Sequence, residues 1–81
     1  TVYPNPATSE CRIGWIPFRE EEGILEVLDL AGRRMVYRPL TPADALTGTT
    51  LLPLTGWPAG TYLVRLITSR HHLSAPLVVN P

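Results

Sequence analysis

The stretch GWPAGTYLVRL, Gly56 to Leu66, decides the fold class that the sequence predicts. It begins with residues that favour turns, pauses at Gly60 and continues into an alternating run, Thr61–Thr68. Alternation with a period of two is typical of a half-buried β-strand. Because the stretch holds no candidate catalytic residue, we expect it to be structural, with Gly60 in a conformation that a side chain would penalise. The inward set is Tyr62, Val64 and Leu66, and the outward set is Leu63, Arg65 and Ile67.

Short segments of the same kind fill the rest of the chain. Nine prolines and six glycines interrupt it at short intervals, and the segments between them favour strands. We expect no helix, and we expect the proline-rich segment Pro39–Gly48 to cross between two sheets. The expected strands are Thr1–Tyr3, Glu10–Ile16, Ile24–Leu30, Arg34–Arg38, Thr49–Leu54, Thr61–Thr68 and Ser74–Val79.

Alternating side chains and turn-forming residues predict the conformation or the facing of several positions. Gly32 is able to take the positive φ that a tight reversal after Asp29 needs. Pro53 marks its strand as an edge or as the site of a bulge, because proline cannot donate to a sheet ladder. The residues expected to share a face are Cys11, Ile13 and Trp15 in one strand, Leu25 and Val27 in the next, and Met35 and Tyr37 in the third.

These features predict an all-β fold. Seven short strands with turns about every 8–12 residues are typical of a small Ig-like antiparallel β-sandwich. The 81 residues allow one domain, residues 1–81. A domain of this size buries only about 60–65% of its unfolded surface. Most inward side chains must therefore serve the core.

Composition excludes several classes of function. The formal net charge is +0, which gives no electrostatic reason to bind nucleic acid or an anionic membrane. Cys11 is the only cysteine, so an internal disulfide and a cysteine-only zinc site are both excluded. We expect Cys11 to be a small buried apolar residue. No apolar run reaches the roughly 18 residues of a membrane span, and no signal peptide is visible. We interpret the chain as a piece of a longer protein.

Two clusters contain residue types that can bind metal ions. His71 and His72 lie in a predicted turn, where they would need further ligands to hold a metal. Glu20, Glu21 and Glu22 are consecutive, whereas calcium loops interleave carboxylates with turn residues and carbonyls. We expect a solvated turn and a solvated loop, and no metal or cofactor.

Serine and aromatic residues are the candidates for catalysis and for sugar binding. The serines at positions 9, 69 and 74 lie in turn-like contexts without a nucleophile elbow, so we expect no catalytic residue and no enzyme activity. Aromatic side chains could stack on sugars, but Trp57 and Tyr62 are better explained as core residues. For Trp15 and Tyr37 the two roles stay open.

Four phrases of the chain carry a resemblance to a known family. They are VYPNPATSECRI, VLDLAGRRMV, LPLTGWPAGTYLVRL and a final LVV, in this order over nearly all 81 residues. They resemble the C-terminal sorting domain of type IX secretion (the Por secretion system) in Bacteroidetes-type bacteria, type A family. The matching residues are Tyr3, Pro4, Asn5, Pro6, Asp29, Gly32, Arg33, Pro58, Ala59, Gly60, Tyr62, Leu77, Val78 and Val79.

The sequence also departs from the family pattern. Trp57 stands where the family usually has a leucine, and Pro76 stands where a lysine is usual before the last strand. The chain has no lysine at all. If that lysine contacts the secretion apparatus, recognition is altered or Arg70 substitutes for it.

The resemblance implies a targeting module without a substrate, cofactor or nucleic-acid partner. The expected partners are an N-terminal cargo domain in the same chain, the outer-membrane translocon and a surface sortase that cleaves the domain off. The expected route is through the periplasm to the cell surface or the medium.

We hypothesise that recognition uses Thr61–Thr68, Ala75–Val79 and the turn between them. The terminal edge strand would accept a receptor strand by β-augmentation. Leu63 and Ile67 would either add apolar contact to that surface or pack against a loop or a second sheet, and both alternatives stay open.

A second hypothesis is an accessory Ig-like or carbohydrate-binding module of a secreted hydrolase. A row of exposed aromatic residues on one sheet face would favour this hypothesis. Buried Trp57 and Tyr62, together with a bare edge strand at the C-terminus, would favour the sorting domain.

Overall fold

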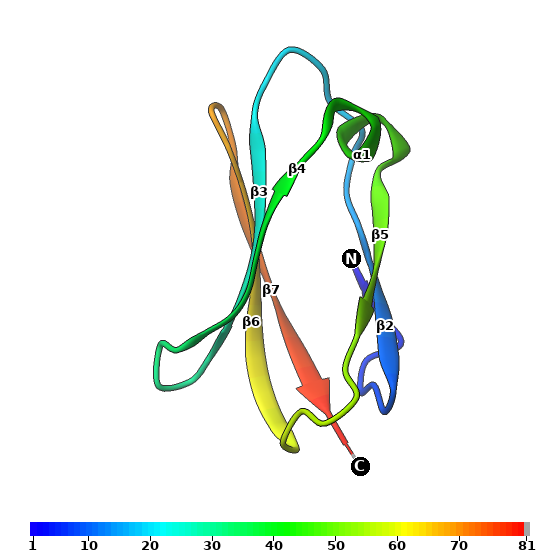
Figure 1. Ribbon diagram of the computed structural model, residues 1–81, viewed down its shortest axis with the longest axis vertical. Helices are drawn as coiled ribbons and strands as arrows, with labels where there is room; N and C mark the ends of the chain where they lie inside the picture. Colours follow the sequence, from blue (N-terminus) through cyan, green and yellow to red (C-terminus); the bar gives the residue numbers. More distant parts are fainter. Residues whose placement is uncertain (81) are drawn as a thin grey trace.

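Two antiparallel sheets face each other in the computed structural model, which describes residues 1–80 (Figure 1). One sheet has three strands in the order β1-β2-β5, and the other has four in the order β4-β3-β6-β7. This architecture confirms the predicted all-β sandwich of seven strands. The strands are β1 (Val2–Tyr3), β2 (Glu10–Gly14), β3 (Gly23–Asp29), β4 (Arg34–Leu40), β5 (Thr49–Pro53), β6 (Gly60–Thr68) and β7 (His72–Val79).

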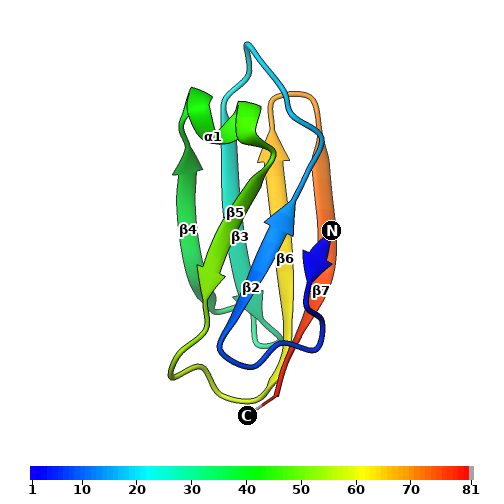
Figure 2. The ribbon, with the colours of Figure 1, turned by 90° about the vertical axis from the view of Figure 1, so that its right-hand side faces the viewer.

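The order of the strands is that of an Ig-like sandwich. In Figure 2 the three-stranded sheet lies in front, with the four-stranded sheet behind it. The connection after β4 crosses from the four-stranded sheet to β5, as expected for Pro39–Gly48. Strand β5 is an edge strand that ends at Pro53, which confirms the position predicted for this proline.

The prediction that the chain has no helix is wrong. Helix α1 (Pro42–Thr47) lies in the crossing connection and begins with a capping box. The Thr41 hydroxyl accepts a hydrogen bond from the Asp44 N–H at 3.1 Å, and the Asp44 carboxylate accepts one from the Thr41 N–H at 3.0 Å. Pro42 favours the first helical turn because its missing N–H would have no helical partner there. The helix ends at Gly48, which is in the left-handed conformation.

The core lies between the sheets and is built by the predicted inward positions. Cys11 and Ile13 of β2, Leu25 and Val27 of β3, and Tyr62, Val64 and Leu66 of β6 are all buried. Ala7, Leu52, Leu54, Leu77 and Val79 also belong to the buried cluster, and Trp15 packs against it. Burial raises the pKa of the Cys11 thiol, in keeping with its role as a buried apolar residue.

One predicted face is wrong. Met35 and Tyr37 were expected to point the same way, but the pairing of β3 with β4 contains a β-bulge between Val27 and Leu28. The bulge leaves an extra residue in β4, so Met35 and Val36 both pack against the core. Tyr37 pairs with Glu26 on the opposite face and is half exposed.

Candidate recognition surface

Three residues that carry the family resemblance, Asp29, Tyr62 and Leu77, lie together at one end of the four-stranded sheet. Asp29 of β3 pairs with Tyr62 of β6, and Tyr62 pairs with Leu77 of β7, so the three form one row across the sheet. The loop before β6, the β3–β4 turn and the C-terminus all lie at this end, and α1 lies at the other (Figure 1). Three phrases that are far apart in the sequence therefore build one continuous structural unit.

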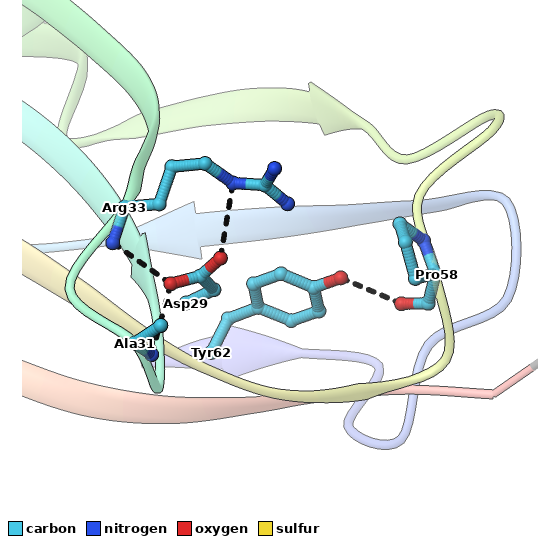
Figure 3. Close-up of polar contacts among 5 residues, drawn as sticks. All are labelled: Asp29, Ala31, Arg33, Pro58 and Tyr62. Atoms are coloured by element: carbon cyan, nitrogen blue, oxygen red, sulfur yellow. Dashed lines mark hydrogen bonds and ion pairs between the residues drawn. The ribbon is translucent and has the colours of Figure 1, made fainter.

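Asp29 holds the β3–β4 turn together. Its carboxylate Oδ1 accepts hydrogen bonds from the backbone N–H groups of Ala31 at 3.0 Å and Arg33 at 2.8 Å (Figure 3). The Arg33 guanidinium donates to Oδ2 at 3.1 Å. Gly32 has φ +86°, which confirms the predicted positive φ of this turn. Asp29, Gly32 and Arg33 thus have a structural role.

Tyr62 fixes the loop that precedes β6. Its side chain is buried, and its hydroxyl donates a 2.6 Å hydrogen bond to the backbone carbonyl of Pro58 (Figure 3). The ring of Trp57 lies 5.0 Å from that of Tyr62 at an interplanar angle of 53°. Between them, Gly60 has φ +155°, a conformation that a side chain would penalise, as predicted. Trp57 packs against the core, as expected for this pair.

Asn5 and Ala7 fasten the N-terminal segment to the outer edge of β7. We name residues 4–7 the strap. The Asn5 amide donates to the Pro76 carbonyl at 3.0 Å and accepts from the Val78 N–H at 2.9 Å. Ala7 is fully buried and forms a parallel bridge with Val79 through hydrogen bonds to Val78 and Asn80. The strap thus completes the edge of the sheet much as an added strand would.

The strap corrects the expectation that the edge of β7 is bare. It covers the half of β7 from Pro76 onward and leaves His72–Ala75 at the edge. The reason is a change of sheet: Val2 and Tyr3 pair with β2 in the three-stranded sheet, so the N-terminal segment meets β7 only after Pro4. A receptor strand could therefore add only to the first half of β7 unless it displaced the strap.

Residues 1–80 match the family model for the secretion system C-terminal sorting domain. The chain belongs to this family. The match confirms the resemblance to type IX sorting domains and the sorting-signal function that it implies. It also implies export toward the cell surface or the extracellular space, with a cargo in the same chain. No curated protein matches the chain.

The outer face of the four-stranded sheet of the sorting domain carries two rows that contain apolar side chains. Leu63 is 37% exposed and pairs with Leu28 and Pro76 in one row, while Ile67 pairs with Ile24 and His72 in another. The second sheet covers the opposite face, so it does not cover Leu63 or Ile67. This arrangement excludes packing against the second sheet for both residues and leaves Leu63 available to a partner, whereas Ile67 is only partly exposed.

A network of charges separates these two rows. Glu26 is only 6% exposed, and its carboxylate binds the guanidinium of Arg34 at 2.9 Å and that of Arg65 at 3.5 Å. Arg34 also lies 4.6 Å from the centre of the Tyr37 ring. The network neutralises Glu26, whose burial would otherwise be costly.

Glu21 and His72, one residue from each candidate metal cluster, form hydrogen bonds at the β6–β7 end of the sorting domain. The Glu21 carboxylate accepts hydrogen bonds from the Arg70 N–H at 3.1 Å and the Ser69 hydroxyl at 3.3 Å, so it caps the β6–β7 turn. His72 begins β7, and its Nε2 lies 2.9 Å from the Arg65 guanidinium. Within residues 1–80, no three potential ligands lie close enough to hold a metal ion. In the same range, no helix is long and apolar enough to cross a bilayer.

The exposed aromatic side chains do not form a row. Tyr3, which is 75% exposed, belongs to the three-stranded sheet, and Tyr37 belongs to the four-stranded sheet. Trp15 is only partly exposed, packs against the core and donates from its indole N–H to the Ala45 carbonyl at 3.4 Å. Among the described residues, the pattern expected of a carbohydrate-binding face is not present.

Proposed function

We propose that this sorting domain directs a cargo protein, joined to its N-terminal side, through the outer membrane by way of the type IX translocon. A surface sortase then cleaves the domain from the cargo. Residues 1–81 would be one domain of a longer secreted protein that passes through the periplasm. The observation that carries the proposal is the family match over residues 1–80, with the motif residues Asp29, Tyr62 and Leu77 in one row at an end of the four-stranded sheet.

The motif residues act in this proposal as the frame of the signal. Asp29 and Tyr62 bind backbone groups of their own turns, and Asn5 binds the edge of β7. Leu77 and Val79 are buried in the core. Their role is to hold β6 and β7 in a fixed arrangement, and the exposed parts of these strands with their turn contact the translocon. Such a module needs a stable surface rather than a reaction centre, and its family is not an enzyme family.

A transport assay tests the proposal. Residues 1–81 are fused behind a signal peptide and a fluorescent protein in a host with type IX secretion. The expected result is fluorescence on the cell surface or in the medium, lost when the translocon is deleted. A fusion that is folded in the periplasm but is not exported in the intact host would contradict the sorting role.

The cleavage step needs a separate readout. In a host that has the translocon but lacks the sortase, the exported fusion is expected to keep its full mass on an immunoblot. Cleavage that continues without the sortase would contradict this part of the proposal. For the transport assay, a fusion that ends at Ser74 is not a suitable negative control. It lacks the core residues Leu77 and Val79, so loss of export would follow from unfolding.

A further inference from the structure

An apolar cleft opens beside the part of β7 that the strap leaves uncovered. Its volume is about 440 Å³, and it lies between the first half of β7 and the strands β1 and β2. Its lining includes Val2, Trp15, Ile16, Leu66 and Leu73. Ile16 is 88% exposed and Leu73 is 53% exposed, so the mouth of the cleft carries large apolar side chains in contact with water.

Backbone groups at the same place lack partners. Along β7, the groups of alternate residues point toward β6 and toward the outer edge. The strap binds the backbone groups of Pro76 and Val78 that point outward, away from β6. His72 and Ser74 lie an even number of positions before Pro76, so their N–H and C=O groups also point outward. No other strand of residues 1–80 pairs with this side of His72–Ala75. The free edge is therefore continuous with the part of the β7 edge that the strap occupies through Asn5 and Ala7.

Next to this free edge lies a guanidinium that has no carboxylate partner among residues 1–80. It belongs to Arg70, which is in the turn that precedes β7. The neighbouring carboxylates are already engaged: Glu21 with the turn itself, and Glu26 with Arg34 and Arg65. In the part of the chain that the structure describes, Arg70 has no ion pair. An acidic group on a partner would complement this end.

We propose that a strand of a secretion-apparatus protein adds to β7 along His72–Ala75. The partner strand is extended, places one apolar side chain in the cleft beside Leu73, and carries a carboxylate next to Arg70. This inference rests on the proposed sorting function and names the part of β7 that is recognised. The strap restricts the added strand to this half, because the Asn5 amide occupies the edge from Pro76 onward.

The test is the fluorescent fusion with Ser74 replaced. Ser74→Pro removes the N–H that points outward and leaves the hydrogen bonds to β6 in place. The strand already holds a proline, Pro76, at a position whose backbone groups point outward in the same way. Ser74→Ala is the matched control that keeps the N–H. We expect at least a tenfold loss of export for Ser74→Pro and no loss for Ser74→Ala. Equal export of the two folded variants would overturn the inference.

A second pair of variants avoids any effect of proline on folding. Leu73→Glu places a charge at the mouth of the cleft, and Leu51→Glu places the same charge at a similarly exposed position of the other sheet. Loss of export for Leu73→Glu alone supports the inference, and equal export of both overturns it. If the unmodified fusion is exported only with the translocon while these variants change nothing, the inference fails and the sorting function stands. If the unmodified fusion is not exported, the sorting function itself fails.

A second copy of the chain is the alternative occupant of the edge. Sedimentation of the purified domain distinguishes it from a partner strand. A monomer in solution supports the inference. A dimer that Ser74→Pro dissociates would assign the free edge to self-association and would overturn it.

Discussion

The side chain of Asn5 is hydrogen-bonded to the backbone of Val78, 73 residues further along the chain, at 2.9 Å. The same amide donates to the carbonyl of Pro76, so one side chain satisfies two backbone groups of an edge strand. This relationship gives the YPNP phrase a structural purpose. It anchors the N-terminal end of the sorting domain, where the cargo would be attached, to the strand that ends the chain.

The first prediction concerns this anchor. Asn5→Ala is expected to lower the free energy of unfolding by about 1 kcal/mol, the net value of such hydrogen bonds at a site that water can reach. Hydrogen exchange of the Val78 amide should accelerate more than that of residues in β3. Asn5→Asp keeps the acceptor for Val78 and loses the donor to Pro76, so it should fall between Asn5→Ala and the unmodified domain. Unchanged exchange at Val78 in Asn5→Ala would exclude the anchor.

The second prediction concerns the hydroxyl of Tyr62. Tyr62→Phe removes the 2.6 Å hydrogen bond to Pro58 and leaves the buried ring in place, so we expect a loss of about 1 kcal/mol. Tyr37→Phe is the matched control, since Tyr37 is half exposed and should lose almost nothing. Urea denaturation measures both. Equal stability of the two variants would show that the Pro58 contact contributes nothing.

The third prediction separates the two roles of Asp29. Asp29→Asn keeps an oxygen acceptor for the backbone N–H groups of Ala31 and Arg33 but loses the ion pair with the Arg33 guanidinium. Since the Arg33 side chain is 70% exposed, this ion pair is expected to contribute little. Asp29→Ala should therefore cost about 1–2 kcal/mol and Asp29→Asn much less. Equal losses in thermal denaturation would assign the effect to the charge instead.

The fourth prediction concerns the start of α1. Thr41→Ala removes the cap that accepts from the Asp44 N–H and should cost about 1 kcal/mol. Thr41→Ser keeps the hydroxyl and should retain most of the stability. Thermal denaturation of the two variants distinguishes a capping effect from a general sensitivity of the connection, in which case both substitutions would destabilise alike.

The fifth prediction concerns pH. Hydrogen bonds from the Thr68 hydroxyl, the Arg70 N–H and the Ser69 hydroxyl hold the pKa of Glu21 below its ordinary value of 4.5. A carboxyl group with a lowered pKa in the folded state stabilises the fold above the unfolded pKa, and this contribution is lost as the pH falls through the folded pKa. The stability difference between the unmodified domain and Glu21→Gln should therefore shrink below about pH 4.5.

Urea denaturation at pH 7 and at pH 3 measures this difference. Glu22→Gln carries the same change of charge at the neighbouring position and is the control for net charge. A difference that is the same at both pH values would show that Glu21 does not stabilise the turn through its charge.

Helix α1 could have been predicted from local signals in the sequence. The signals were present in the sequence, because Thr41 and Asp44 form a capping box, Pro42 suits the first turn and Gly48 suits the end. Proline interrupts a helix in its interior but is favoured at the first helical position, which Pro42 occupies. The β-bulge at Met35, unlike the helix, could not have been predicted locally. No signal in the sequence of β4 distinguishes an extra residue from ordinary alternation.

By itself the sequence determined the period-two strands, the inward faces of β2, β3 and β6, the turn at Gly32, the buried Tyr62 and the family. These properties are local, because successive side chains of a strand point to opposite faces whatever it pairs with. Only the tertiary structure decided that Asn5 and Ala7 cover one half of β7 and leave His72–Ala75 open. It also decided that Glu26 would be buried between two arginines on an outer face. These features depend on which segments meet in space, and that is set by the pairing of whole strands rather than by the residues beside them.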